Sequence, residues 1–182
     1  YGNVIAVGEY RGTLTVDGQT ITSAGDRDVF IAKFTDTLGL LWIKSFGGAG
    51  ADRANSVALD NSDNAYVTGF FEGNATFGGV NVVSNGGQDV FVAQVDDQGN
   101  VGWVHAGGSV AADQGIAIDV QSNGVSYVTG WYTGAATFGA VNLNSAGSRD
   151  VFVTKLSNAG VVQWSKSGGG TGVDQGIGIG VN

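Results

Sequence analysis

The sequence contains no cysteine, no proline and no methionine, and one histidine among its 182 residues. Without cysteine the chain has neither a disulfide framework nor a thiolate metal site. The absence of proline beside 33 glycines excludes collagen-like and proline-rich disordered classes. Since no apolar run approaches the roughly 18 residues of a transmembrane helix, we expect no membrane insertion.

Basic residues are also scarce, with 8 Lys and Arg against 16 Asp and Glu, for a net charge of −8. A chain of this charge is unsuited to neutralising phosphates, so we expect no nucleic-acid partner. Hydrophobic residues make up 42% of the chain and charged residues only 13%, which is typical of a protein with a packed core. Short runs rich in valine, threonine and aromatic residues, separated by glycine, predict an all-β fold.

The chain repeats itself every 61 residues without a gap, most clearly in three "DVF" triplets. The positions that keep this step include Asp28, Asp89 and Asp150; Trp42, Trp103 and Trp164; Asp52, Asp113 and Asp174; and Gly8, Gly69 and Gly130. The period divides a single array into three repeats, at 1–61, 62–122 and 123–182. The tryptophans are expected to pack between repeats. The glycines are expected to allow a close approach or a bulge within a strand.

Each repeat predicts four strands joined by short turns, which leaves no room for a helix. The first strand is represented by 115–120, the second by 126–132, the third by 89–95 and the fourth by 101–107. Between the second and third strands, 75–88 is expected to form a loop or small hairpin.

The third strand distinguishes between all-β architectures. In "DVFVTKL", Val151 and Val153 lie on one face, and Phe152 and Leu156 lie on the other. A strand covered on both faces is continuously apolar, whereas a sandwich strand with one solvated face alternates. Four-stranded sheets stacked around an axis satisfy this pattern, so we predict β-propeller blades. A β-solenoid is the alternative.

The runs "DNAYVTG" (63–69) and "VSYVTG" (125–130), the "DVF" triplets and the "W...GG" endings resemble the SBBP repeat, named for a seven-bladed β-propeller. The resemblance covers the whole chain, three times over. It implies a secreted or surface-exposed bacterial or archaeal protein, and it implies no enzyme, cofactor or known site. The first repeat departs from the pattern, with "GNVIAVGEY" where the others place an aromatic residue before Thr-Gly.

The chain begins in the second strand of a repeat and ends with a first strand, which suits split-blade closure of a ring. Three blades are too few for a propeller of about four to eight blades. We therefore predict self-association, in which two chains complete a six-bladed ring with two-fold symmetry. The alternatives are an excerpt of a longer array and an open-ended fibre. The start at Tyr1, in a chain without methionine, suggests a processed or excised piece.

Two series of aspartates are expected on one side of the array, because the loops before the third and first strands share a face of a meandering sheet. The series comprise Asp28, Asp52, Asp89, Asp113, Asp150 and Asp174. The first interpretation is that each carboxylate accepts hydrogen bonds from turn N–H groups. The alternative is calcium, which takes several oxygen ligands. No other cofactor is expected.

A specific ligand site should use positions at which the repeats differ. Phe70 and Phe71 in the second repeat correspond to Trp131 and Tyr132 in the third, with Asn142 nearby. Such residues suit sugar stacking or a hot spot for a protein partner. The alternative interpretation is that they form hydrophobic cover over the hairpin.

No catalytic signature is present. His105 aligns with Lys44 and Lys166 and is expected to be a solvated surface residue. We therefore predict a non-enzymatic binding or adhesion scaffold for a glycan or protein ligand, from an extracellular or cell-surface protein. The alternatives are a structural building block of a homo-oligomer or fibre, and a polysaccharide-active enzyme that uses a carboxylate pair.

Overall fold

The computed structural model describes residues 2–182, and within this range it contains strands and no helix, hence no helix that could cross a membrane. The strands are β1 (Val4–Tyr10), β2 (Thr13–Val16), β3 (Gln19–Thr22), β4 (Asp28–Phe34), β5 (Leu40–Gly48), β6 (Arg53–Leu59), β7 (Ala65–Phe77), β8 (Val80–Val95), β9 (Val101–Gly107), β10 (Gln114–Val120), β11 (Ser126–Tyr132), β12 (Ala135–Phe138), β13 (Val141–Asn144), β14 (Asp150–Leu156) and β15 (Val162–Gly168). The predicted all-β class is confirmed.

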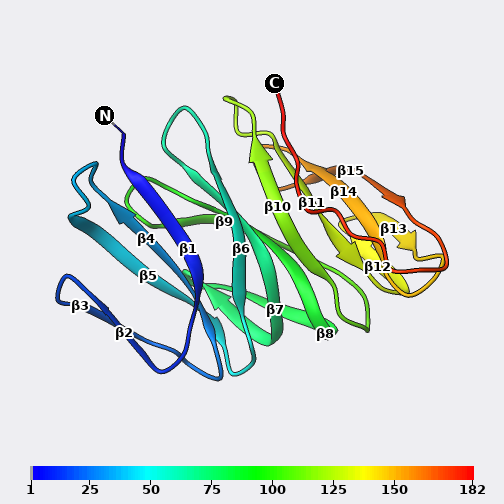
Figure 1. Cartoon of the computed structure of the whole chain (residues 1–182), viewed down its shortest axis with the longest axis horizontal. Coiled ribbons are helices and arrows are strands. Elements are labelled where there is room, and N and C mark those ends of the chain that lie inside the picture. Colours follow the sequence, from blue (N-terminus) through cyan, green and yellow to red (C-terminus); the bar gives the residue numbers. More distant parts are fainter. Residues whose placement is uncertain (1) are drawn as a thin grey trace.

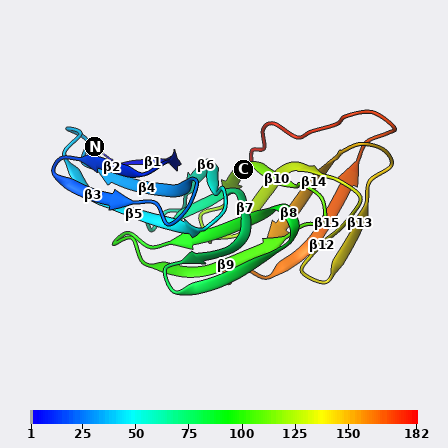
Figure 2. The same ribbon diagram turned by 90° about the horizontal axis from the view of Figure 1, so that it is seen from below.

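The long strands form three antiparallel groups that we call units 1, 2 and 3, and the pairing of β5 with the outer part of β7 joins units 1 and 2 into one seven-stranded sheet. Unit 1 pairs β1, β4 and β5 in that order, unit 2 pairs β6 to β9, and unit 3 pairs β10, β11, β14 and β15. The units lie side by side in chain order (Figure 1), and the same succession is visible when the molecule is turned (Figure 2). All ladders between these strands are antiparallel, unlike the parallel coils of a solenoid.

Small hairpins extend from each unit, and those of units 2 and 3 pair with the preceding unit. They are formed by β2 with β3, by the outer halves of β7 and β8, and by β12 with β13. The predicted excursion at 75–88 is thus a hairpin. At the end of β5, Gly47 pairs with Thr76 in the hairpin of unit 2, and Gly108 pairs likewise with Thr137 in unit 3.

Each face of the middle sheet is covered by a neighbouring unit. Phe91 and Val95, both fully buried, belong to the core shared with unit 1, whereas Val90 and Val92 belong to the core shared with unit 3. This arrangement explains the continuously apolar third strand of the sequence. Burying a phenylalanine side chain contributes about 1.5–3 kcal/mol, so the two shared cores hold the units together.

Two of the three repeated tryptophans, Trp42 and Trp103, lie between units, as predicted. Trp42 Nε1 donates to the Asp97 carbonyl at 2.9 Å, and Trp103 Nε1 donates to the Asn158 carbonyl at 3.0 Å. Each indole thereby reaches the turn after the third strand of the next unit. Trp164, in unit 3, has no such acceptor among residues 2–182 and is 37% exposed.

We expect Trp103→Phe to lower the free energy of unfolding by about 1 kcal/mol, because it removes one interunit hydrogen bond while keeping an aromatic ring. The matched variant Trp164→Phe should change it by less than about 0.5 kcal/mol. Urea denaturation followed by circular dichroism measures both. Equal effects of the two substitutions would contradict the interunit role of Trp103.

The last residues run back along unit 3. Gly176 N donates to the Gly130 carbonyl at 3.0 Å, and Val181 N donates to Asp119 Oδ2 at 2.8 Å. This segment lies where the first strand of a following sheet would pack. The units do not close into a ring within residues 2–182, so the six-bladed ring of two chains stays a prediction.

Candidate functional site

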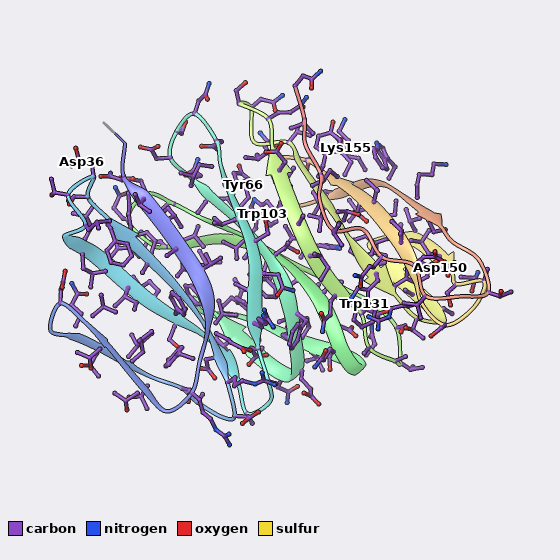
Figure 3. All side chains as sticks on the ribbon, in the orientation of Figure 1. Asp36, Tyr66, Trp103, Trp131, Asp150 and Lys155 are labelled. Atoms are coloured by element: carbon purple, nitrogen blue, oxygen red, sulfur yellow. The ribbon has the colours of Figure 1, made fainter. Side chains whose placement is uncertain are left out.

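The two aspartate series come together at the junctions between units. Asp28 and Asp89 lie within strands of units 1 and 2, and Asp52 and Asp113 directly precede β6 and β10. These four side chains are 0–2% exposed. Asp150 occupies the same position in unit 3 and is 3% exposed (Figure 3). Buried carboxylates are uncommon, because burying a charge is unfavourable unless hydrogen bonds or an opposite charge compensate for the lost water.

At the junction between units 2 and 3, backbone amides satisfy most of the carboxylate oxygens. Asp113 Oδ2 accepts from Ser109 N at 2.6 Å, and its Oδ1 accepts from Thr133 N at 2.8 Å. Asp89 Oδ2 accepts from Asn85 N at 3.0 Å. Asp113 therefore connects the end of unit 2 to the hairpin of unit 3, as expected of a carboxylate that caps turn N–H groups.

The junction between units 1 and 2 repeats this arrangement. Asp52 accepts from Gly48 N at 2.7 Å and from Glu72 N at 3.1 Å. Asp28 Oδ2 accepts from Ala24 N at 3.0 Å. The same bonds at the same repeat positions show that the turn-capping interpretation describes both series.

The two carboxylates of a junction face one another across a glycine. A Cβ atom placed on Gly108 would lie 2.8 Å from Asp89 Oδ1 and 2.8 Å from Asp113 Oδ2. A Cβ atom on Gly47 would lie 3.2 Å from Asp28 Oδ1 and 2.6 Å from Asp52 Oδ2. The repeated "GG" after each tryptophan thus leaves room for a pair of acids, which sequence reasoning did not anticipate.

This pairing changes the acidity of the groups. Burial raises the pKa of Asp52 to about 6, against hydrogen bonds from Gly48 and Glu72 that lower it, and repulsion by Asp28 and Glu72 adds to the increase. Burial likewise raises the pKa of Asp89 to about 6, with repulsion by Asp113 contributing. Burial also raises the pKa of Asp113.

One oxygen of each aspartate in the first series has no hydrogen-bond partner within residues 2–182. These buried atoms are Oδ1 of Asp28, Asp89 and Asp150. The same oxygen is thus unsatisfied in all three repeats. No group of three or more His, Cys, Asp or Glu side chains suited to a metal occurs in the described part of the chain, and calcium binding stays a prediction.

The aspartates in the sequences "DNSDN" and "VDDQGN" serve as turn caps. Asp60 Oδ1 accepts from Ser62 N at 2.8 Å and from Asn64 N at 3.0 Å. Burial would raise the pKa of Asp60, but these bonds outweigh burial and lower it. Asp96 makes the corresponding bonds with Gln98 and Asn100. These two loops therefore use their acids for local structure.

The aromatic residues predicted to contact a ligand lie in the interior. Phe70 is 4% exposed, Phe71 and Tyr132 are 0% exposed, and Trp131 is 9% exposed. The Arg149 guanidinium carbon lies 4.4 Å from the centroid of the Trp131 ring and covers it. Asn142 is exposed and accepts a hydrogen bond from Thr137 Oγ1 at 2.9 Å. Ligand binding here stays a prediction, for which only Asn142 presents a surface.

The prediction that His105 is a solvated surface residue is wrong. His105 is half-buried, its Nε2 is buried without a hydrogen-bond partner in the described residues, and burial lowers the pKa of its imidazole. It lies on the fourth strand of unit 2 opposite Val92, on the face that unit 3 covers. Its counterparts Lys44 and Lys166 suggested exposure because a lysine can extend its charge to water past an apolar surface.

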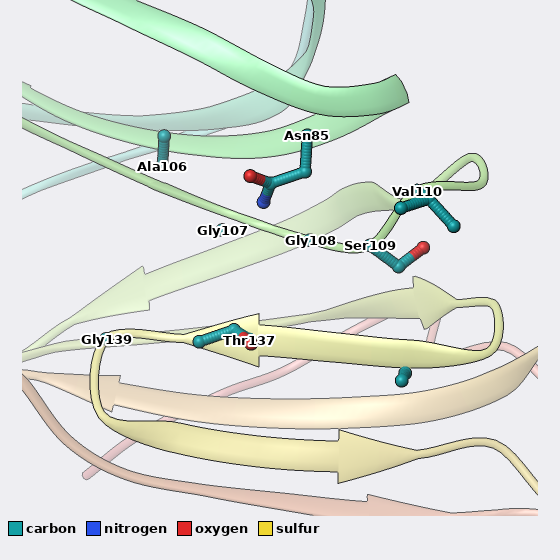
Figure 4. Close-up of a pocket in the computed structure, with 9 residues that line it drawn as sticks. Asn85, Ala106, Gly107, Gly108, Ser109, Val110, Thr137 and Gly139 are labelled. Carbon is teal, nitrogen blue, oxygen red and sulfur yellow. The ribbon is translucent and has the colours of Figure 1, made fainter.

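A cleft of about 520 Å³ lies between units 2 and 3 (Figure 4). It adjoins the Asp89–Asp113 pair, because its residues Asn85 and Ser109 donate backbone hydrogen bonds to these carboxylates. The lining residues are Asn85, Ala106, Gly107, Gly108, Ser109, Val110, Ala135, Thr137 and Gly139. Val110 is 83% exposed at its edge. The sequence contained a signal for this cleft, because Asn85 and Val110 stand where the other repeats place alanine or threonine.

Residues 41–69 match the family model described as a beta-propeller repeat, SBBP. The matched segment contains one member of three repeated series, Trp42, Asp52 and Gly69, and the resemblance is confirmed there. The chain is also 24% identical over 161 residues to "Uncharacterized WD repeat-containing protein L264" of Acanthamoeba polyphaga mimivirus. That alignment covers 69% of this chain and 11% of the relative, so the chain matches about a tenth of the relative's length.

Proposed function

We propose that this chain is a non-enzymatic β-propeller repeat module that serves as a binding scaffold for a protein partner. In this proposal units 1, 2 and 3 are propeller blades. The SBBP match and the WD-repeat relative support it, because WD repeats form propellers of four-stranded blades. The proposal keeps the extracellular or cell-surface setting that the repeat resemblance implies.

The cleft between units 2 and 3 is the observation that carries the proposal. Two of its side chains are specific to one junction: Val110 corresponds to Ala49 and Thr171, and Asn85 corresponds to an alanine in each of the other repeats. Other lining residues recur, since Gly108 and Thr137 stand at positions identical in all three repeats. Repeat-specific side chains on a concave surface suit recognition of a particular ligand.

The chemistry of this surface favours a protein segment over a sugar. Sugar stacking needs an accessible aromatic face, and the rings of Phe70, Phe71, Trp131 and Tyr132 are buried. The cleft instead offers an exposed valine, the amide of Asn85 and the hydroxyl group of Thr137. An apolar contact beside a few polar groups is typical of a site for a peptide or loop.

Selection from a random 12-residue peptide library on the immobilised chain tests the proposal. We expect enriched peptides to bind the wild type, and Val110→Asp to weaken them at least 10-fold by placing a charge at the apolar edge of the cleft. Leu38→Asp is the matched control, because Leu38 is 69% exposed on the turn between β4 and β5, away from the cleft. It should leave binding unchanged.

A glycan array run with the same proteins separates the alternatives. Retention of glycans, with no enriched peptide, would replace the protein partner by a sugar ligand. Equal loss of peptide binding in Val110→Asp and Leu38→Asp would contradict the assignment of the cleft.

A further inference from the structure

We propose that each junction between units binds a calcium ion between its two aspartates, Asp28 with Asp52 and Asp89 with Asp113. The proposal concerns a site that the scaffold function does not require. It rests on the geometry of the carboxylates and on their unsatisfied oxygens, at two independent places in the chain.

The first observation is that an unsatisfied oxygen points into each junction. Asp89 Oδ1 is buried, accepts no hydrogen bond within residues 2–182, and lies on the side of its carboxylate that faces Gly108. Asp28 Oδ1 is in the same situation at Gly47. An ionised carboxylate oxygen left without a donor in the interior costs several kcal/mol. The unsatisfied oxygen nevertheless recurs at the same position of each repeat.

The second observation is the position of the opposing carboxylate. Asp89 Oδ1 and Asp113 Oδ2 each lie 2.8 Å from one common point, the place of a Cβ on Gly108. The distance between these two oxygen atoms is therefore at most twice 2.8 Å. Calcium–oxygen bonds of about 2.3–2.6 Å hold two ligands up to ~5 Å apart, so small side-chain movements suffice for both to bind one ion.

The surroundings suit a hard cation. A divalent cation between Asp89 and Asp113 would neutralise the charges of both carboxylates. Asn85 and Ser109 contact the pair through their backbone amides and also line the cleft, through which water can supply the remaining ligands. Carboxylate, carbonyl and water oxygens select calcium or magnesium over zinc, and calcium tolerates irregular geometry better.

Isothermal titration calorimetry of the EDTA-stripped chain with calcium chloride at pH 7.5 tests the proposal directly. We expect two ions per chain, and a rise of at least about 4 °C in Tm at saturating calcium. Asp89→Asn should bind one ion, because it disables one junction and leaves the other intact. Asp36→Asn makes the same charge change on an exposed turn and should still bind two.

Two results would overturn the proposal. The first is an absence of calcium-dependent heat together with identical Tm values in calcium and in EDTA, which would leave a bound proton as the partner of the carboxylates. The second is the same loss of calcium binding in Asp36→Asn as in Asp89→Asn, which would assign binding to net charge. The wild-type titration requires no variant to fold.

Discussion

Gly69→Ala should lower the free energy of unfolding by at least about 3 kcal/mol, although alanine is normally favoured over glycine in a strand. A Cβ at this position would lie 1.8 Å from the Arg53 carbonyl oxygen and 2.9 Å from Ala54 Cα. Both are backbone atoms of β6, which bulges between Ala54 and Ser56 opposite this glycine. The methyl group can be accommodated only by breaking the pairing of β6 with β7.

Gly8→Ala is the matched control, because Gly8 occupies the same repeat position in β1. There the nearest atom to an added Cβ is Cε1 of the Phe30 ring, at 2.8 Å, which can move by rotation of its side chain. We expect a change below about 1 kcal/mol. Urea denaturation followed by tryptophan fluorescence measures both variants. A Gly69→Ala protein as stable as the wild type would contradict the close approach of β6.

In EDTA, the acids at the junctions should contribute a gain in stability of roughly 2 kcal/mol as the pH falls from 7 to 5. The pKa of Asp52 and that of Asp89 are both raised to about 6 in the folded state, mainly by burial. An acid whose folded pKa exceeds its unfolded value destabilises the protein when ionised. This penalty is relieved as the pH falls through the folded pKa, by about 1 kcal/mol per group at pH 5.

One opposing group titrates inside this window. Burial lowers the pKa of the His105 imidazole, so the unfolded chain takes up a proton there as the pH falls below about 6.5 while the folded chain resists, and part of the gain is lost. The other opposing groups titrate below the window. Asp60 and Asp96 have lowered pKa values, since turn hydrogen bonds overcome the effect of their burial, and the stability they provide is lost only below about pH 4. Asp89→Asn should therefore reduce the gain between pH 7 and pH 5 by about 1 kcal/mol, and Asp36→Asn should preserve it. Urea midpoints at the two pH values measure this difference. An Asp89→Asn protein whose stability changes with pH as much as that of the wild type would contradict the raised pKa of Asp89.

The period of 61 residues predicted most of the fold. It predicted the limits of β9 and β11 to the residue, and the continuously apolar third strand predicted a sheet covered on both faces. It also predicted that Gly69 and Gly130 mark a close approach, and a bulge lies opposite each of them. Such features can be predicted because the same local sequence pattern recurs in every repeat.

The sequence was less informative about the site, because burial depends on which faces meet. The aromatic pairs Phe70–Phe71, in the middle of β7, and Trp131–Tyr132, at the end of β11, were predicted to contact a ligand because they differ between repeats. They are buried, since the hairpin and the adjacent unit cover that part of the strand. The exposure of His105 was predicted wrongly for the same reason. Identity in all repeats identified the aspartates, but only the structure brought Asp89 to face Asp113.

Neighbouring sheets interlock through residues repeated at the same step, so that Trp42 packs on Gly99 and Trp103 packs on Gly160 of the following unit. A Cβ on Gly160 would lie 2.5 Å from Cδ2 and Cε3 of the Trp103 ring, which places the Gly160 α-protons against the indole. A nuclear Overhauser spectrum of the labelled chain should therefore show a strong cross-peak between Gly160 Hα and Trp103 Hε3. Absence of this cross-peak, with the antiparallel cross-strand peaks within units intact, would show that the sheets fold separately and would contradict the account.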